Sequence, residues 1–81
     1  SAPDIAGKNV ANPYAMIMST SMLLSWMGSK YSEEKLIMAS NIIEDSTSEV
    51  IKERKYLTAD IGGKSSTIDM TNAIIEKVKT R

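Results

Sequence analysis

One acidic residue near the start of the chain has surroundings that could do chemistry. Asp4 lies among Pro3, Gly7, Asn9 and Asn12, directly before a predicted helix. A carboxylate can accept hydrogen bonds from two neighbouring hydroxyl groups, such as those of a ribose, and the free amides of a loop and a helix N-terminus can face the polar edge of a base. The segment therefore suits a nucleotide, although an ordinary surface loop carries the same residue types and is the more common explanation on these residues alone.

Other patterns that could carry chemistry are weaker. Gly63-Lys64-Ser65 resembles the end of a phosphate-binding loop, but the glycine required five positions earlier is replaced by Thr58. The chain has no histidine and no cysteine, which excludes a serine–histidine triad, a Cys/His zinc site and a disulfide. Its adjacent pairs of acidic residues point about 100° apart on a helix, so solvated faces explain them better than a metal site.

The length and the charge exclude several classes of protein. The chain has 81 residues, which is one domain at most, with a small core. Its formal net charge of +0 argues against a nucleic-acid partner, which would favour an excess of cations. The most apolar stretch, Ala15 to Met27, is too short to cross a bilayer, and the first residues do not resemble a signal peptide. We expect a cytoplasmic location and no membrane partner.

A first helix must follow the Asp4 loop. Asn12-Pro13 is a strong helix start, because Asn accepts hydrogen bonds from first-turn amides and Pro loses none at the first helical position. The apolar pattern continues to Met27, and Gly28 predicts a left-handed stop. Apolar residues cover most of the circumference of this helix, so we expect it to be buried inside a larger body or between subunits.

Two further helices are predicted. The second spans about 33–54, with Ser32 as its N-cap and acidic residues in its first turn. Ser66 or Thr67 caps the third helix, and Ser66 with Asp69 is close to a capping box. The residues between these two helices have an extended or turn-like pattern. The chain is therefore expected to be mainly α, with three helices plus an extended or turn stretch.

The motifs together resemble one enzyme family. They are Ser1-Ala2-Pro3-Asp4-Ile5-Ala6-Gly7-Lys8, Ala11-Asn12-Pro13, the Met/Leu-rich stretch 16–28, Tyr56-Leu57-Thr58-Ala59-Asp60-Ile61-Gly62-Gly63, and Ser66-Thr67 followed by Ala73-Ile74. In order and without large gaps, they resemble the C-terminal segment of the isocitrate/isopropylmalate dehydrogenase family, the NAD-dependent β-decarboxylating dehydrogenases. The resemblance implies that these helices belong to the large α/β domain of an isopropylmalate dehydrogenase-like fold. It makes residues 1–81 a single segment, with a nucleotide-binding loop at 1–12 and a helical part at 13–81.

The resemblance also implies roles for individual residues. In members that use NAD, the residue matching Asp4 holds the adenosine ribose hydroxyls, Ile5 packs beside it, and the residue matching Asn12 contacts the adenine. Ser1, Ala2 and Pro3 belong to the same cofactor-binding loop, with the backbone of Ala2 lining the site.

The same resemblance separates the two nicotinamide cofactors. Members that use NADP usually have a basic residue at the Asp4 position and a tyrosine at the Ile5 position, and some have tyrosine and arginine at the positions of Ala59 and Gly63. A carboxylate repels a 2′-phosphate but accepts a hydrogen bond from a 2′-hydroxyl. The sequence therefore predicts NAD rather than NADP.

The family's catalytic tyrosine and lysine, its substrate arginines and its metal-binding aspartates all lie upstream of the matched segment. The chain is thus expected to be the C-terminal, adenosine-binding part of a dehydrogenase that oxidises a 2-hydroxy acid such as isocitrate or 3-isopropylmalate, and not to be catalytic by itself. Mg or Mn would act in the complete enzyme, with ligands outside this chain.

Two alternatives remain open on the sequence. The chain could be a free-standing, non-enzymatic helical module for binding or assembly derived from this family, or a helical bundle whose apolar first helix makes a homodimer. The expected partner is the remainder of the dehydrogenase or another copy of the chain, and we expect a homo-oligomer. A segment that needs such a partner should expose an apolar face along Met16–Trp26, whereas a self-contained module should cover it.

Overall fold

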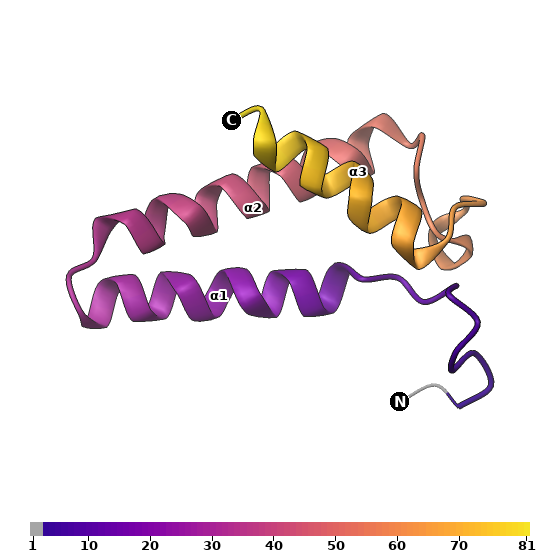
Figure 1. Ribbon diagram of the computed structural model, residues 1–81, viewed down its shortest axis with the longest axis horizontal. Helices are drawn as coiled ribbons and strands as arrows, with labels where there is room; N and C mark the ends of the chain where they lie inside the picture. Colours follow the sequence, from indigo (N-terminus) through magenta and orange to yellow (C-terminus); the bar gives the residue numbers. More distant parts are fainter. Residues whose placement is uncertain (1–2) are drawn as a thin grey trace.

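A computed structural model describes residues 3–81, which form three α-helices and one short 3₁₀ helix. Helix α1 spans Tyr14–Lys30, α2 spans Glu34–Glu53, η1 spans Ala59–Ile61 and α3 spans Thr67–Lys79. Helices α1 and α2 lie side by side as an antiparallel hairpin, and α3 packs against the C-terminal half of α2 (Figure 1). The predicted three-helix organisation is confirmed within residues 3–81, and the stretch between α2 and α3 is a turn that contains η1.

The core is small and lies where α2, α3 and the segment between them meet. Its fully buried apolar residues are Val50, Leu57, Met70 and Ile74. The molecule measures only 41 × 28 × 15 Å. Because a helix with its side chains is about 10–12 Å across, the shortest dimension holds little more than one layer of helices. Globular domains generally bury their apolar faces between at least two layers.

Helix α1 shows the consequence of this single layer. Met16 is 74% exposed, Met22 70%, Trp26 56% and Leu23 55%. The prediction that α1 is a buried helix is wrong for the chain as described, because no element within residues 3–81 covers this side. The exposed apolar face is instead the feature expected of a segment that needs a partner. We call these four residues the α1 apolar face.

Small residues let α1 and α2 approach closely on their shared side. The buried Ser21 hydroxyl donates to the Ser40 carbonyl oxygen at 3.0 Å, and the two hydroxyl oxygens are 2.9 Å apart. Gly28 is buried inside α1, where an added Cβ would lie 2.6 Å from Ile37 Cγ1. The prediction that Gly28 ends the helix is therefore wrong, since α1 continues to Lys30 and the glycine provides room for α2.

The predicted helix starts were partly correct. Asn12 Oδ1 accepts a hydrogen bond from the Tyr14 amide at 2.9 Å, and Ser66 Oγ accepts one from the Asp69 amide at 3.0 Å. Ser32 does not cap α2, because it adopts a left-handed φ of 53° in the tight turn after α1 and Glu33 occupies the N-cap position. Among residues 3–81, no helix combines the length and the apolarity that a membrane crossing requires.

Candidate functional site

The loop that carries Asp4 begins with a tight turn. The Lys8 amide donates to the Ile5 carbonyl oxygen at 3.1 Å, and Gly7 has a φ of 76° inside that turn. Glycine adopts this left-handed conformation without the steric cost that a Cβ imposes. Pro3 and Asp4 are exposed and Ile5 is half-buried. The turn therefore leaves the Asp4 carboxylate accessible.

The other half of the loop is fixed to the start of α3. The Asn9 carbonyl oxygen accepts from the Thr67 amide and Asn9 Oδ1 from the Ile68 amide, both at 3.0 Å. The Thr67 hydroxyl donates to the Ala11 carbonyl oxygen at 2.5 Å. Asn9 has a φ of 56°, a conformation that asparagine tolerates better than most residues. The loop thus supplies the hydrogen-bond acceptors that the first amides of α3 need.

Asn12 joins the loop to two other elements. Its Oδ1 bonds the first amide of α1, and its Nδ2 donates to Asp60 Oδ2 in η1 at 3.1 Å. Asn12 also lines a hollow of about 370 Å³ between the loop, the end of α2 and η1. The other residues of this hollow are Tyr14, Ile51, Arg54, Leu57 and Ile61. Apolar walls with one amide and one guanidinium suit a flat polar ring.

Asp60 is held in the charged state by its neighbours. The hydrogen bond from the Thr58 hydroxyl, 2.5 Å from Asp60 Oδ1, lowers the pKa of Asp60 below its ordinary value of 3.8. The bond from Asn12 and nearby backbone amides lower the pKa further, while partial desolvation opposes them. Near neutral pH the Asp60 carboxylate is therefore an anion that only accepts hydrogen bonds.

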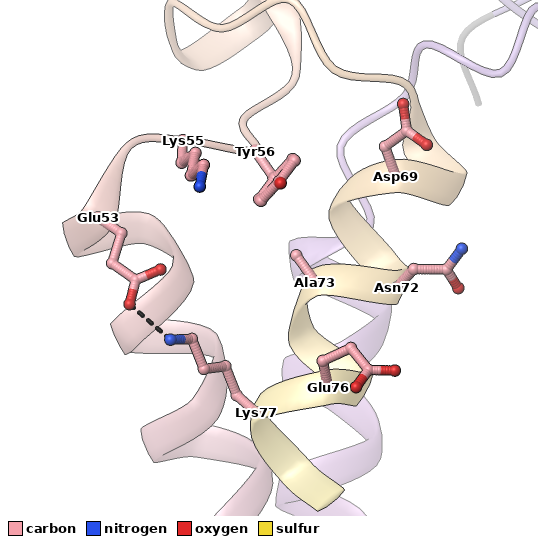
Figure 2. A pocket seen from close by; sticks show the side chains of 8 residues that line it. All are labelled: Glu53, Lys55, Tyr56, Asp69, Asn72, Ala73, Glu76 and Lys77. Atoms are coloured by element: carbon pink, nitrogen blue, oxygen red, sulfur yellow. Dashed lines mark hydrogen bonds and ion pairs between the residues drawn. The ribbon is translucent and has the colours of Figure 1, made fainter. Parts of the chain in front are cut away.

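A second groove, of about 440 Å³, lies between the end of α2 and α3 (Figure 2). Its lining residues do not include Pro3, Asp4, Ile5 or Asn12. Lys77 Nζ lies 2.6 Å from Glu53 Oε2 and 3.2 Å from Glu49 Oε2, and these acids raise the pKa of Lys77. Its cation is thus paired with acids of α2, and these ion pairs link α3 to α2.

The site residues predicted from the sequence lie at the two ends of one loop, as far as the structure describes them. Ser1 and Ala2 lie outside the described residues. Pro3, Asp4 and Ile5 lie in one accessible turn, and Asn12 lies at the other, fixed end of the loop. Within residues 3–81, no three acidic side chains gather as a metal site would require.

Asp60 and Thr58 are site residues that the sequence analysis did not assign. Asp60 bonds a residue 48 positions away, a separation over which local patterns say nothing. The only local sign was the Thr-x-Asp spacing, which favours a side-chain bond within a turn.

Comparison with known proteins places the chain in a family. A sequence profile described as isocitrate/isopropylmalate dehydrogenase matches residues 1–78. The chain is 43% identical over 75 residues to a 3-isopropylmalate dehydrogenase of Sulfurisphaera tokodaii, covering 93% of this chain and 22% of that protein. It is 46% identical over 77 residues to isocitrate dehydrogenase [NAD] subunit 1, mitochondrial, of Saccharomyces cerevisiae, covering 95% of this chain and 19% of that protein.

A third relative gives the same result. Isocitrate dehydrogenase [NAD] catalytic subunit 5, mitochondrial, of Arabidopsis thaliana is 46% identical over 76 residues, covering 94% of this chain and 18% of that protein. The chain thus spans about a fifth of the length of the curated relatives it matches. With the profile match over nearly its whole length, the chain belongs to the isocitrate/isopropylmalate dehydrogenase family.

Proposed function

We propose that this chain is the adenosine-binding part of an NAD-dependent decarboxylating dehydrogenase that oxidises a 2-hydroxy acid such as isocitrate or 3-isopropylmalate. The observation that carries the proposal is the loop of residues 3–12. Asp4 is exposed at its open end, while Asn9 and Asn12 fix its other end to α3 and η1. Because hydrogen bonds hold one end of the loop, the loop loses less conformational entropy when its carboxylate binds a ligand.

The residues present fit the adenosine half of the cofactor. The Asp4 carboxylate would accept hydrogen bonds from the two ribose hydroxyls, with Ile5 packed beside the sugar and Pro3 in the same turn. The amide of Asn12 would meet the polar edge of the adenine, next to the hollow that it lines. NAD accepts a hydride when bound, and the residues named here would only bind and orient it.

Glycine at position 63 supports NAD over NADP, because it provides no cation for the 2′-phosphate of NADP. A Cβ at this position would lie 1.8 Å from the Leu57 carbonyl oxygen, so the chain as folded has no room for any side chain there. An arginine at this position, as some NADP-using members have, would require a different path of the backbone. The Asp4 carboxylate acts in the same direction, because it repels the 2′-phosphate of NADP.

The catalytic step requires groups that this chain does not contain. We propose that a base, the substrate-binding cations and an Mg²⁺ or Mn²⁺ ion come from the rest of a longer polypeptide. The chain covers about a fifth of its relatives' length, which supports this reading.

The α1 apolar face supports a partner as well. We propose that the remainder of the dehydrogenase covers it, and that the assembled enzyme is a homo-oligomer. A free-standing helical module is disfavoured because none of the helices within residues 3–81 covers this face. A homodimer of the segment through α1 is the competing explanation. Analytical ultracentrifugation separates them, since a lone segment that forms a discrete dimer through α1 would favour the homodimer.

Calorimetric titration of NAD into the complete dehydrogenase that carries this segment tests the cofactor proposal. Asp4→Ala removes the acceptor for two hydroxyl hydrogen bonds, each worth about 1.5–3 kcal/mol when one partner is charged. After allowance for solvent exposure, we expect NAD to bind roughly 30- to 1000-fold more weakly. Asp45→Ala, which removes an exposed acid from α2, is the matched control and should leave the affinity unchanged. An Asp4→Ala protein that binds NAD as well as its parent would refute the proposed role.

We also propose a cytoplasmic location for the complete protein. Two of the relatives carry "mitochondrial" in their names. Fractionation of cells with an antibody to the complete protein would decide between the two compartments.

A further inference from the structure

A chain of side-chain hydrogen bonds connects the buried core to Asn12. Thr58 is 0% exposed, and its hydroxyl donates to Asp60 Oδ1 at 2.5 Å. The other oxygen of the same carboxylate, Oδ2, accepts from Asn12 Nδ2 at 3.1 Å. Asp60 thus lies between a fully buried residue and the residue proposed to meet the adenine.

The segment that carries Asp60 is firmly held. The Ile61 and Gly63 amides both donate to the Thr58 carbonyl oxygen, at 3.2 and 3.0 Å. The Ser65 amide donates to the Leu57 carbonyl oxygen at 2.9 Å, and Leu57 belongs to the core. Backbone and side-chain hydrogen bonds together orient the Asp60 carboxylate, so that its Oδ2 faces Asn12.

This arrangement specifies which way round the Asn12 amide lies. A carboxylate only accepts, so it requires the Nδ2 end of Asn12, and the Tyr14 amide only donates, so it requires Oδ1. A flipped amide would place oxygen against oxygen at Asp60 and two donors together at Tyr14. Both partners therefore favour the same orientation of Asn12.

The orientation leaves a defined recognition pattern. One hydrogen of Asn12 Nδ2 and one lone pair of Oδ1 remain for a ligand, in a fixed order. Adenine offers the complement, an amino group that donates next to a ring nitrogen that accepts. Hypoxanthine has a carbonyl oxygen in place of that amino group, so it would set an acceptor against the Asn12 oxygen.

We propose that Asp60, held by Thr58, is a positioning residue that fixes the orientation of the Asn12 amide and thereby makes the cofactor site select adenine over hypoxanthine. This inference rests on the proposed function, because it requires the adenosine of NAD to lie at Asn12. It assigns a role to the Thr-x-Asp part of the 56–63 motif, which the proposed function leaves without one.

The test is calorimetric titration of the complete dehydrogenase with NAD and with nicotinamide hypoxanthine dinucleotide. The parent protein should prefer NAD by roughly 5- to 150-fold, the range for one paired contact to adenine. Asp60→Ala removes both acceptor oxygens, so the Thr58 hydroxyl and the Asn12 amide both lose their partner at this position. The preference of this variant for NAD should be about threefold or less, which is below the lower limit of the range expected for the parent. In steady-state kinetics the loss should appear in KM for NAD rather than in kcat.

A second pair of variants keeps the test independent of folding. Thr58→Val removes the hydroxyl with little change in shape and should lower the preference, whereas Thr58→Ser keeps the hydroxyl and should restore it. Asp45→Ala should behave as the parent protein. If Asp60→Ala and Thr58→Val both retain the full preference for NAD, the positioning role is wrong.

Asn12→Ala separates this failure from failure of the proposed function. If Asn12→Ala loses the preference while Asp60→Ala keeps it, Asn12 recognises adenine without help from Asp60, and only the further inference falls. If Asn12→Ala and Asp4→Ala both bind NAD as the parent does, the proposed adenosine site itself is wrong.

Discussion

Replacing Gly63 with alanine should destabilise the segment more than the same change at the other loop glycines, Gly7 and Gly62. The new Cβ would lie 1.8 Å from the Leu57 carbonyl oxygen, 2.3 Å from the carbonyl carbon and 2.6 Å from Leu57 Cβ. Ordinary contact begins near 3.4 Å, so the two backbones would have to separate by about 1.6 Å. Leu57 is 1% exposed and cannot withdraw without opening the core.

The magnitude follows from what this separation breaks. Overpacking of a well-packed site costs about 1–3 kcal/mol, and occasionally more. The hydrogen bond from the Ser65 amide to the Leu57 carbonyl oxygen would be lost as well, at about 1 kcal/mol. We therefore expect a loss of about 2–4 kcal/mol, which corresponds to a fall in Tm of roughly 4–16 °C in a domain of 150–250 residues.

Thermal unfolding of the complete dehydrogenase, followed by circular dichroism, measures this loss. Gly7→Ala is the matched control, because Gly7 has a φ of 76° but an added Cβ would meet nothing within 4 Å. It should cost only about 1 kcal/mol for the left-handed backbone. The reasoning is refuted if Gly63→Ala costs no more than Gly7→Ala, since steric contact would then not decide the outcome.

Two further substitutions have definite expected outcomes. Ser46 is buried in α2, and within residues 3–81 its hydroxyl has no hydrogen-bond partner. Ser46→Ala should therefore raise the free energy of unfolding by about 1 kcal/mol, because it removes an unpaired buried hydroxyl and improves helix propensity. A loss of stability in urea titrations would show that the hydroxyl is paired in solution. The depressed pKa of Asp60 should add stability that is present above its ordinary pKa of 3.8 and is lost as pH falls through the lower, folded value. Unfolding measured from pH 7 to pH 2 should therefore show a difference between parent and Asp60→Asn that disappears in strong acid, and a difference independent of pH would contradict the assignment.

The sequence predicted those parts of the fold that depend on local interactions. Ser66 caps α3 as expected, and Asn12 accepts from the first amide of α1 although Pro13 occupies the N-cap position, because such bonds need only a side-chain oxygen and an amide two or three residues away. The inner stripe of α3 was also predictable, since Met70 and Ile74 are buried at helical spacing.

Features that depend on a neighbouring element were not predictable in the same way. Gly28 has the usual composition of a helix stop, but Ile37 of α2 packs so closely on it that it belongs inside α1. The hydroxyls of Ser21 and Ser40 pair between two helices, and no local pattern indicates a contact between residues 19 positions apart. The burial predicted for α1 is not found within residues 3–81, because an apolar pattern on a helix does not show which element covers it.

The residues of the candidate site also differ in whether the sequence alone identifies them. Asp4 and Asn12 were identified through a motif in which residue type and order carry the information. Asp60 was not, because its contact with Asn12 exists only after η1 folds beneath the loop. Thr58 was not identified either, because it contacts Asn12 only indirectly, through the Asp60 carboxylate.

The ratio of the dissociation constants for NADP and NAD, measured for the parent dehydrogenase and for Asp4→Asn, tests the central claim most directly. Unit charges about 4 Å apart interact by roughly 1 kcal/mol in water and about 4 kcal/mol near a protein surface. If the Asp4 carboxylate faces the adenosine ribose, the parent should prefer NAD, and Asp4→Asn should improve NADP binding by about fivefold or more while NAD binding weakens. An unchanged ratio would contradict the account, because it would mean that this carboxylate does not lie beside the ribose.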